Sequence, residues 1–303
     1  PIWLAERNVA LGEELISQGS RQGRDVALDD LWTATRGQYQ FTAHAQNILD
    51  RRLDAQSIIP PGAFSQYMRT QFQPNEIRTE IDQGIEMFRA QTQRHKQNPH
   101  YTEWLAKAEQ YAADPSFDSL IELYSTRILI ARNEGKRQMM LDLNPLPAEE
   151  LDERDSSQVH GAAEIFVHEE LEIPYYFGIE RLCSMATNNV EELLALAAAL
   201  YQGLQAKQVL RRPELLLSPH EQEKLLKEVA ARKREFISKA HTEGTRARSL
   251  LDAIGSYCRA KTFQPSAPIA PGVTGVRLSQ LELRKLHSKE GPLAERSATL
   301  RRV

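Results

Sequence analysis

The chain has 303 residues, of which 41% are hydrophobic and 26% charged, and its formal net charge is −3. This balance allows two or three packed domains and excludes wholesale disorder. No apolar run approaches the roughly 18 residues of a membrane-spanning helix, so we expect a cytoplasmic protein with no membrane partner. The two cysteines, Cys183 and Cys258, exclude a disulfide framework and indicate a reducing compartment.

Charge is divided unevenly along the chain. Residues 207–261 hold 13 lysines and arginines against 7 acidic residues, and residues 262–303 hold 7 against 3. The rest of the chain carries the excess of acid. The acidic N-terminal part and the basic C-terminal part predict different partners, although ordinary solvated surfaces would give the same pattern. The chain begins at Pro1 and stops at Val303 inside an expected helix, so we also expect a fragment.

Helical periodicity dominates the first half of the chain. We expect helices over residues 6–17, 40–53, 76–97, 102–113 and 118–133. Ile77, Ile81, Ile85 and Phe88 form the clearest apolar stripe, and Gly135 is the expected C-cap of the last of these helices. Short helices with tight breaks are typical of bundles, and no fixed repeat period is present.

Two capping signals mark helices of the second half. Asn188 with Glu191 predicts one helix start, and Ser218 with Glu221 predicts another. We expect the second of these helices to run to Gly244. Its expected buried residues are Leu225, Leu226, Val229, Phe236 and Ile237.

The C-terminal part alternates between helix, linker and strand signals. Residues 246–259 predict one more helix, and the three prolines of residues 264–272 predict a semi-rigid linker. A short strand over 273–278 and a helix over 279–286 would fit a truncated winged-helix module. The predicted fold class is therefore mostly α, with helical bundle or lid regions followed by a partial winged helix.

Catalytic motifs are missing from the sequence. No G-x-x-x-x-G-K-[ST] segment occurs, so no loop is expected to cradle a nucleotide phosphate. The nucleophile elbow and the zinc-protease pattern are also missing. We expect Cys183 to be a core residue rather than a nucleophile. We expect His95 and His100 to be surface histidines rather than metal ligands. No catalytic or metal site is predicted.

A basic tract near the C-terminus is the strongest binding signal. Lysine and arginine attract phosphates by charge, and Phe236, Tyr257 and Phe263 are interleaved with them. Glu228, Glu235 and Glu243 share the same expected helices, so local pairing into a solvated or intramolecular face is the alternative. The tract consists of Arg232, Lys233, Arg234, Lys239, Arg246, Arg248, Arg259 and Lys261.

Two motifs carry a family resemblance. Residues 173–183 read IPYYFGIERLC and continue into ATNNVE at 186–191, and residues 267–275 read APIAPGVTG. Together they resemble the C-terminal half of bacterial AAA-type P-loop ATPases that are origin-recognition-complex-like, some of them associated with phage defence. The resemblance covers about residues 115–303.

The resemblance implies a nucleotide-binding α/β domain followed by a helical lid and a winged helix. Arg181 would then be the second sensor that reaches toward a γ-phosphate, with Asn188 and Asn189 nearby. A surface arginine paired with Glu180 or Glu191 is the alternative. ATP and Mg²⁺ would bind only with a domain absent from this chain. The expected domains are a helical region of unassigned role (1–114), a lid-like domain (115–212), a basic helical region (213–263) and a partial winged-helix-like module (264–303).

Two functions compete on this sequence. The first is the lid and DNA-contacting portion of an AAA-type ATPase, whose partners are DNA, the missing ATPase domain or other protein subunits, and further copies of the chain. The second is a helical interaction scaffold or oligomerisation module, in which the helices of residues 76–133 receive a protein partner. A free-standing enzyme is disfavoured because no local catalytic signature is present.

Overall fold

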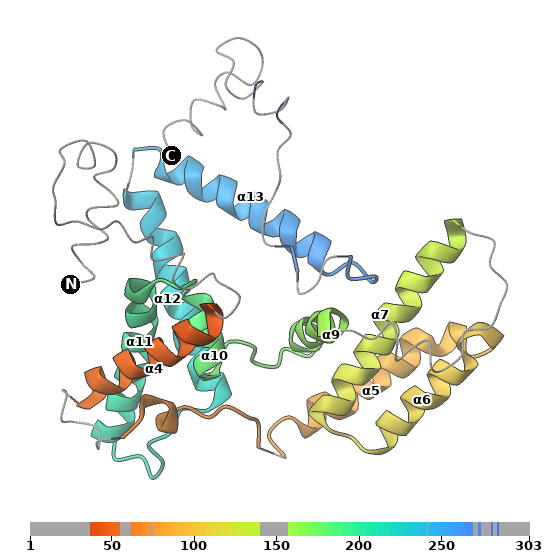
Figure 1. Cartoon of the computed structure of the whole chain (residues 1–303), viewed down its shortest axis with the longest axis horizontal. Helices are drawn as coiled ribbons and strands as arrows, with labels where there is room; N and C mark the ends of the chain where they lie inside the picture. The colour runs from red at the N-terminus through yellow and green to blue at the C-terminus, as the bar shows by residue number, and fades with distance from the viewer. Residues whose placement is uncertain are drawn as a thin grey trace. The chain divides into compact units, whose positions relative to one another are not determined.

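The computed structural model describes residues 37–54, 62–73, 75–139, 157–240, 242–268, 272–273, 280 and 284. Almost all of the regular structure in these residues is α-helical, which confirms the predicted fold class (Figure 1). The helices are α4 (Gly37–Asp54), α5 (Arg78–Thr92), α6 (Thr102–Ala113), α7 (Phe117–Met139), α9 (Ser157–Glu170), α10 (Gly178–Met185), α11 (Val190–Val209), α12 (Pro219–Ala240) and α13 (Gly244–Thr262), with the short 3-10 turns η1 (Phe64–Tyr67), η2 (Gln93–His95) and η3 (Pro99–Tyr101).

The described residues contain no β-strand, and a single isolated bridge pairs Met68 with Leu217. The predicted strand over 273–278 and the helix over 279–286 lie almost wholly outside the described residues, so the winged-helix module stays a prediction. In the same described part of the chain, no helix is long and apolar enough to cross a membrane.

The chain divides into two compact units, each built from two separate stretches of sequence. Unit 1 consists of Pro1–Thr70 and Tyr176–Leu226, and unit 2 of Gln71–Tyr175 and Lys227–Val303. Helix α12 begins in the first unit and continues into the second. The boundaries of these units differ from those of the four expected domains. The four-domain division stays a prediction.

Unit 1 packs α4 against α10 and α11. Phe41, Ala45 and Leu49 recur at four-residue spacing, so they share one face of α4 and are all buried. The facing helices contribute the other large core residues, and burying such apolar side chains is the main force that holds the three helices together. These partners are Leu182, Cys183, Leu193, Leu196, Leu200 and Leu204.

A buried glutamine of α12 links three backbone segments of unit 1. The Nε2 of Gln222 donates to the carbonyls of Arg69 (2.8 Å) and Leu217 (2.9 Å). Its Oε1 accepts from the backbone N–H of Gly178 at 2.9 Å. One side chain thus satisfies backbone groups from three segments, which is the condition for burying an amide without a free-energy penalty.

Unit 2 is a bundle of α5, α6, α7 and α9. The predicted stripe of Ile77, Ile81, Ile85 and Phe88 is buried as expected. Gly84 lies on the same face, where an added Cβ would come within 2.6 Å of a Leu120 methyl group. The stripe packs into one core with Tyr101, Trp104, Leu120, Leu123, Tyr124, Ile128, Phe166 and Val167.

An arginine ties the segment after α13 onto this bundle. The Arg132 guanidinium donates to the carbonyls of Ser266 (2.7 Å) and Ala267 (2.6 Å). Ala267 is itself a buried member of the unit 2 core. Residues from the expected linker therefore belong to the packed body of unit 2.

The capping predictions have mixed outcomes. Ser218 and Glu221 form the predicted box, because the Glu221 N–H donates to Ser218 Oγ (3.3 Å) and the Ser218 N–H donates to Glu221 Oε2 (2.8 Å). The predicted N-cap Asn188 is wrong by one residue. Asn189 caps α11 instead, while Asn188 takes a left-handed φ of 62°. Gly135 is not a C-cap, since α7 continues to Met139.

Helix α12 ends at Ala240, before the predicted Gly244, and a tight turn leads into α13. A Cβ on Gly244 would lie 2.2 Å from the carbonyl oxygen of Ile237, so only glycine fits this turn. The prediction that Phe236 is buried is wrong, because its side chain is 66% exposed. The second half of α12, this turn and α13 all lie in unit 2, and the Arg234–Asp252 ion pair links the two helices; together they are hereafter the α12–α13 hairpin.

Candidate nucleic-acid interface

All eight residues of the basic tract lie on the α12–α13 hairpin. Arg248 and Lys261 are half-buried, and the other six are exposed. Helix α12 carries Arg232, Lys233, Arg234 and Lys239, and helix α13 carries Arg246, Arg248, Arg259 and Lys261.

Much of this positive charge faces a carboxylate. Asp252 on α13 lies 2.7 Å from Arg234 Nε on α12 and 3.8 Å from Arg248 Nε on its own helix. Its hydrogen bond to Arg234 lowers the pKa of the Asp252 carboxyl. Lys239 pairs with Glu235 on its own helix at 2.6 Å, and Arg246 pairs with Glu243, the N-cap residue of α13, at 3.1 Å. The local pairing predicted as the alternative is therefore present.

Other basic residues of the tract make different contacts. Arg259 pairs with Glu169 of α9. The Arg232 Nε donates at 3.4 Å to the carbonyl of Glu228, one turn back on the same helix. Lys261 Nζ lies 5.7 Å from the centre of the Tyr257 ring, which is a cation–π distance. Arg232 and Lys261 thus keep positive charge that no described carboxylate offsets.

The ion pairs on the hairpin are exposed, which limits their strength. The side chains of Arg234, Lys239 and Arg246 are all more than half exposed. Exposed pairs of this kind contribute little to stability and weaken with salt. A phosphate backbone can compete for such arginines, since the exchange replaces one weak ionic contact by another.

Exposed apolar side chains accompany the charges. Tyr257 is 52% exposed, and Phe236, Leu250 and Leu251 are exposed as well. Phe263, the third interleaved aromatic, packs instead against Phe166 with ring centres 5.3 Å apart. Tyr257 and Phe236 are therefore the aromatic rings that the hairpin presents to solvent.

The predicted nucleotide-sensing residues lie in unit 1. Arg181 is a half-buried residue of α10 that already has an interaction partner. The Asn189 side-chain oxygen accepts from the N–H groups of Glu191 (2.9 Å) and Glu192 (3.4 Å). Because this oxygen caps α11, its main role here is structural. The sensing role of Arg181, Asn188 and Asn189 stays a prediction.

A buried histidine was missed by the sequence analysis. His95 is 5% exposed, so its expected place on the surface is wrong. Its Nε2 accepts from Arg94 Nε at 2.9 Å, which leaves the proton on Nδ1, 3.5 Å from Glu134 Oε1. Burial lowers the pKa of His95, against an opposing effect of Glu134. These residues border a cavity of about 410 Å³ that Arg127, Glu170 and Phe166 also line.

Cys183 is buried, as the sequence predicts for a core residue. Burial raises the pKa of the Cys183 thiol to about 11, so the thiol stays protonated and packs as a small apolar group. No group of three or more metal-ligating side chains gathers among the described residues.

The fold and this surface define a helical protein with a basic hairpin. A protein-family model described as ORC-CDC6-like matches residues 11–286. Because the match spans most of the chain, the chain belongs to the ORC-CDC6-like family and is an AAA ATPase-related protein. No curated protein and no solved structure matches it.

Proposed function

We propose that this chain is the helical lid and DNA-contacting portion of an AAA-type ATPase. In this proposal ATP and Mg²⁺ bind to a separate phosphate-binding domain, because no G-x-x-x-x-G-K-[ST] motif occurs in the sequence. The α12–α13 hairpin would contact DNA, and α10 would face the nucleotide through Arg181. Membership of the ORC-CDC6-like family supports the relation to an AAA ATPase.

One observation carries the DNA-contacting part of the proposal. All eight basic residues of the tract lie on one exposed hairpin, together with two exposed aromatic rings. Clustered lysine and arginine bind phosphates without sequence preference, and exposed aromatics add stacking on unpaired bases. Arg232 and Lys261 are the cations of the tract best placed to act, because no described carboxylate offsets them.

The sensing part of the proposal assigns Arg181 to the γ-phosphate. Its guanidinium would stabilise phosphate oxygens by charge and by paired hydrogen bonds. Assembly with other subunits, including further copies of this chain, would bring the nucleotide to α10.

The second candidate function is a helical interaction scaffold. The ion pairs of the hairpin favour it, because Asp252, Glu235, Glu243 and Glu169 together engage five of the eight basic residues. A surface whose charges are mutually satisfied presents little net field to DNA. In this alternative the bundle of α5, α6 and α7 receives a protein partner.

DNA binding measured by fluorescence anisotropy across a salt series separates the two functions. The test variant is Arg232→Gln/Lys233→Gln/Lys261→Gln, which leaves the pairs of Asp252 intact. The matched control removes three positive charges from α5, α6 and the turn between them, in Arg78→Gln/Lys96→Gln/Lys107→Gln.

The proposal predicts a steep loss of affinity with salt for the natural chain. The test variant should lower the slope of log K against log[salt] by about 0.9 for each phosphate that the protein no longer neutralises, and the control should not. Undetectable binding at low salt, or equal effects of the two variants, would reject DNA contact and favour the scaffold.

A further inference from the structure

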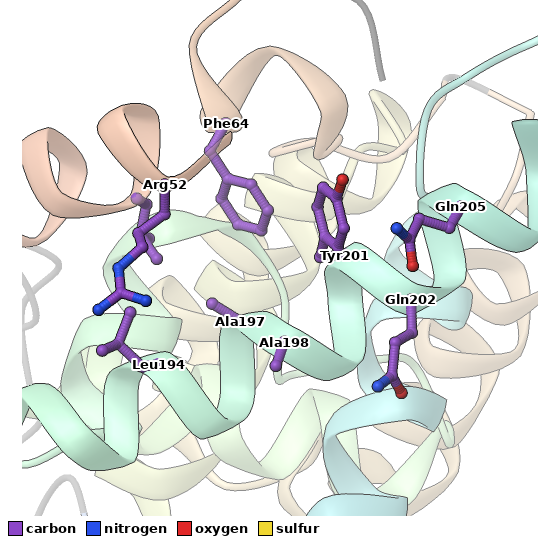
Figure 2. Close-up of a pocket in the computed structure, with 9 residues that line it drawn as sticks. Arg52, Phe64, Leu194, Ala197, Ala198, Tyr201, Gln202 and Gln205 are labelled. Atoms are coloured by element: carbon purple, nitrogen blue, oxygen red, sulfur yellow. The ribbon is translucent and has the colours of Figure 1, made fainter. Parts of the chain in front are cut away.

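Unit 1 holds a half-open pocket that plays no part in the proposed function. It lies between α4, η1 and α11 and has a volume of about 310 Å³ (Figure 2). Leu49 and Phe64 line it from α4 and η1, and Leu194, Ala197 and Tyr201 line it from α11. These side chains make its floor apolar and partly aromatic.

Three polar side chains stand at the rim of the pocket. Figure 2 shows Arg52 beside Leu194 at one end, with Gln202 and Gln205 at the other. Arg52 is exposed, and no described carboxylate pairs with it. The rim therefore offers one positive charge without a described carboxylate partner, and two amide groups, around an apolar floor.

The apolar floor continues along α11 beyond the pocket. Leu194, Ala198 and Tyr201 recur at three- and four-residue spacing, so they share one face of the helix, and the polar rim residue Gln205 follows one turn later. Val209 lies one turn further on that face and is 75% exposed. At about 1.5 Å per residue, the stripe from Leu194 to Val209 is about 22 Å long.

Positive charge also stands at the far end of this stripe. Arg211 and Arg212 follow Val209 closely, are exposed, and pair with no described carboxylate. At each end of the stripe there is thus an arginine that no described carboxylate pairs with. An exposed apolar surface with a polar rim is typical of interaction sites, and its charge selects an acidic partner.

We propose that the groove between α4 and α11 binds an acidic amphipathic helix of a partner protein. Apolar side chains of that helix would enter the pocket and cover Ala198 and Val209, and acidic residues at its two ends would meet Arg52 and Arg211. A helix fits better than a small ligand, since about four helical turns match the length of the stripe.

The probe is a fluorescein-labelled helical peptide of about 15 residues, with leucines on one face and glutamates at both ends. One control peptide has the same composition with its leucines spread around the helix. A second has lysine in place of each glutamate. Binding is measured by anisotropy with the full chain.

Two pairs of protein variants locate the site. Ala198→Trp fills the pocket from an exposed position, and Ala206→Trp adds the same bulk to an exposed position of α11 outside it. Arg52→Glu reverses the charge at the rim, and Lys96→Glu makes the same change at an exposed residue that follows η2. Circular dichroism checks that each variant keeps its helices.

If the groove binds an acidic helix, the natural chain should bind the peptide with a leucine face and terminal glutamates more tightly than either control peptide. Ala198→Trp and Arg52→Glu should each weaken binding by about tenfold or more, and their matched controls should not. Equal binding of the scrambled peptide, unchanged binding by Ala198→Trp, or no binding at all would overturn the proposal. Since Arg52 and Ala198 lie outside the basic tract, these results are independent of the DNA experiment.

Discussion

The guanidinium of Arg127 on α7 donates two parallel hydrogen bonds, each 2.8 Å long, to the carboxylate of Glu170 on α9. The same guanidinium donates to Gln91 of α5 at 2.7 Å and stacks 4.1 Å from the centre of the Tyr124 ring. One side chain therefore joins three helices of unit 2. The pair is largely shielded, with 12% of the Arg127 side chain and 26% of the Glu170 side chain exposed.

Replacing this arginine should destabilise unit 2. Arg127→Met keeps the length of the side chain but leaves the Glu170 carboxylate without its two strong donors. We expect the free energy of unfolding to fall by about 1–3 kcal/mol, the range for hydrogen bonds to charged groups. Urea unfolding followed by circular dichroism measures the change.

Arg78→Met is the matched control for this prediction. Arg78 pairs with Asp82 one turn along α5, and both side chains are about half exposed. Such a pair contributes about 0.3–0.5 kcal/mol, so the control should have a much smaller effect. Equal effects of the two substitutions would mean that the three-helix bridge contributes nothing beyond an ordinary surface ion pair.

A glycine pair on α13 tests the hairpin turn. Gly244→Ala would place a methyl group 2.2 Å from the Ile237 carbonyl oxygen, and this backbone cannot move aside cheaply. We expect a loss of about 1–3 kcal/mol and faster hydrogen exchange along α13.

Gly255→Ala makes the same chemical change without the clash. Gly255 has no atom within 4 Å of an added Cβ, so alanine should stabilise α13 by about 0.5–1 kcal/mol through its better helix propensity. Opposite signs for the two substitutions are the expected result. A stabilising Gly244→Ala would contradict the close turn between α12 and α13.

The sequence predicted the elements whose limits are set by local chemistry. Helix α6 runs from Thr102 to Ala113 as expected. Pro99 lies shortly before its first residue and Pro115 shortly after its last, and proline disfavours continuation of a helix. The Ser218 cap was predicted for the same reason, since its partners are only three residues away. Local signals failed where tertiary contacts decide, as at Asn188, whose left-handed backbone leaves the cap to Asn189.

Burial was predicted less well than helix position. Periodicity identifies the apolar face of α12, but it does not say whether another element covers that face at Phe236. His95 shows the opposite error, because it was predicted to be exposed and is buried. Arg94 and Glu134 lie against its two ring nitrogens and make this burial possible. The basic tract was predicted from composition. Its pairing across the hairpin through Asp252 depends on the turn between two helices, which no local pattern encodes.

Acidification should weaken unit 2 through His95. Burial lowers the pKa of this imidazole in the folded chain, Glu134 partly opposes the effect, and Arg94 adds to it. Protonation therefore favours the unfolded chain. The stability that neutral His95 contributes is present above the ordinary histidine pKa of about 6.5 and is lost as the pH falls below it toward the folded value.

The measurement is urea unfolding at several pH values between about 5 and 7.5. His95→Gln should flatten the pH dependence relative to the natural chain, while His220→Gln, which alters an exposed residue of unit 1, should preserve it. The same pH slope in His95→Gln and the natural chain would exclude His95 as its source.

Releasing the hairpin's own arginines should strengthen DNA binding if the basic tract is the contact surface. Asp252→Asn removes the carboxylate shared by Arg234 and Arg248 and leaves both guanidinium groups available to phosphates. These two ion pairs are weak and exposed, so the fold should survive their removal. We expect tighter binding and a steeper dependence on salt, because more counterions leave the DNA.

Asp114→Asn is the control, since it changes the net charge equally at an exposed residue that follows α6. A general effect of net charge would raise the affinity of both variants alike. A specific gain in Asp252→Asn would instead locate the contact at Arg234 and Arg248. If neither variant binds DNA more tightly, the acidic partners do not hold these arginines back from phosphate, and the charges of Arg234 and Arg248 serve only their ion pairs with Asp252.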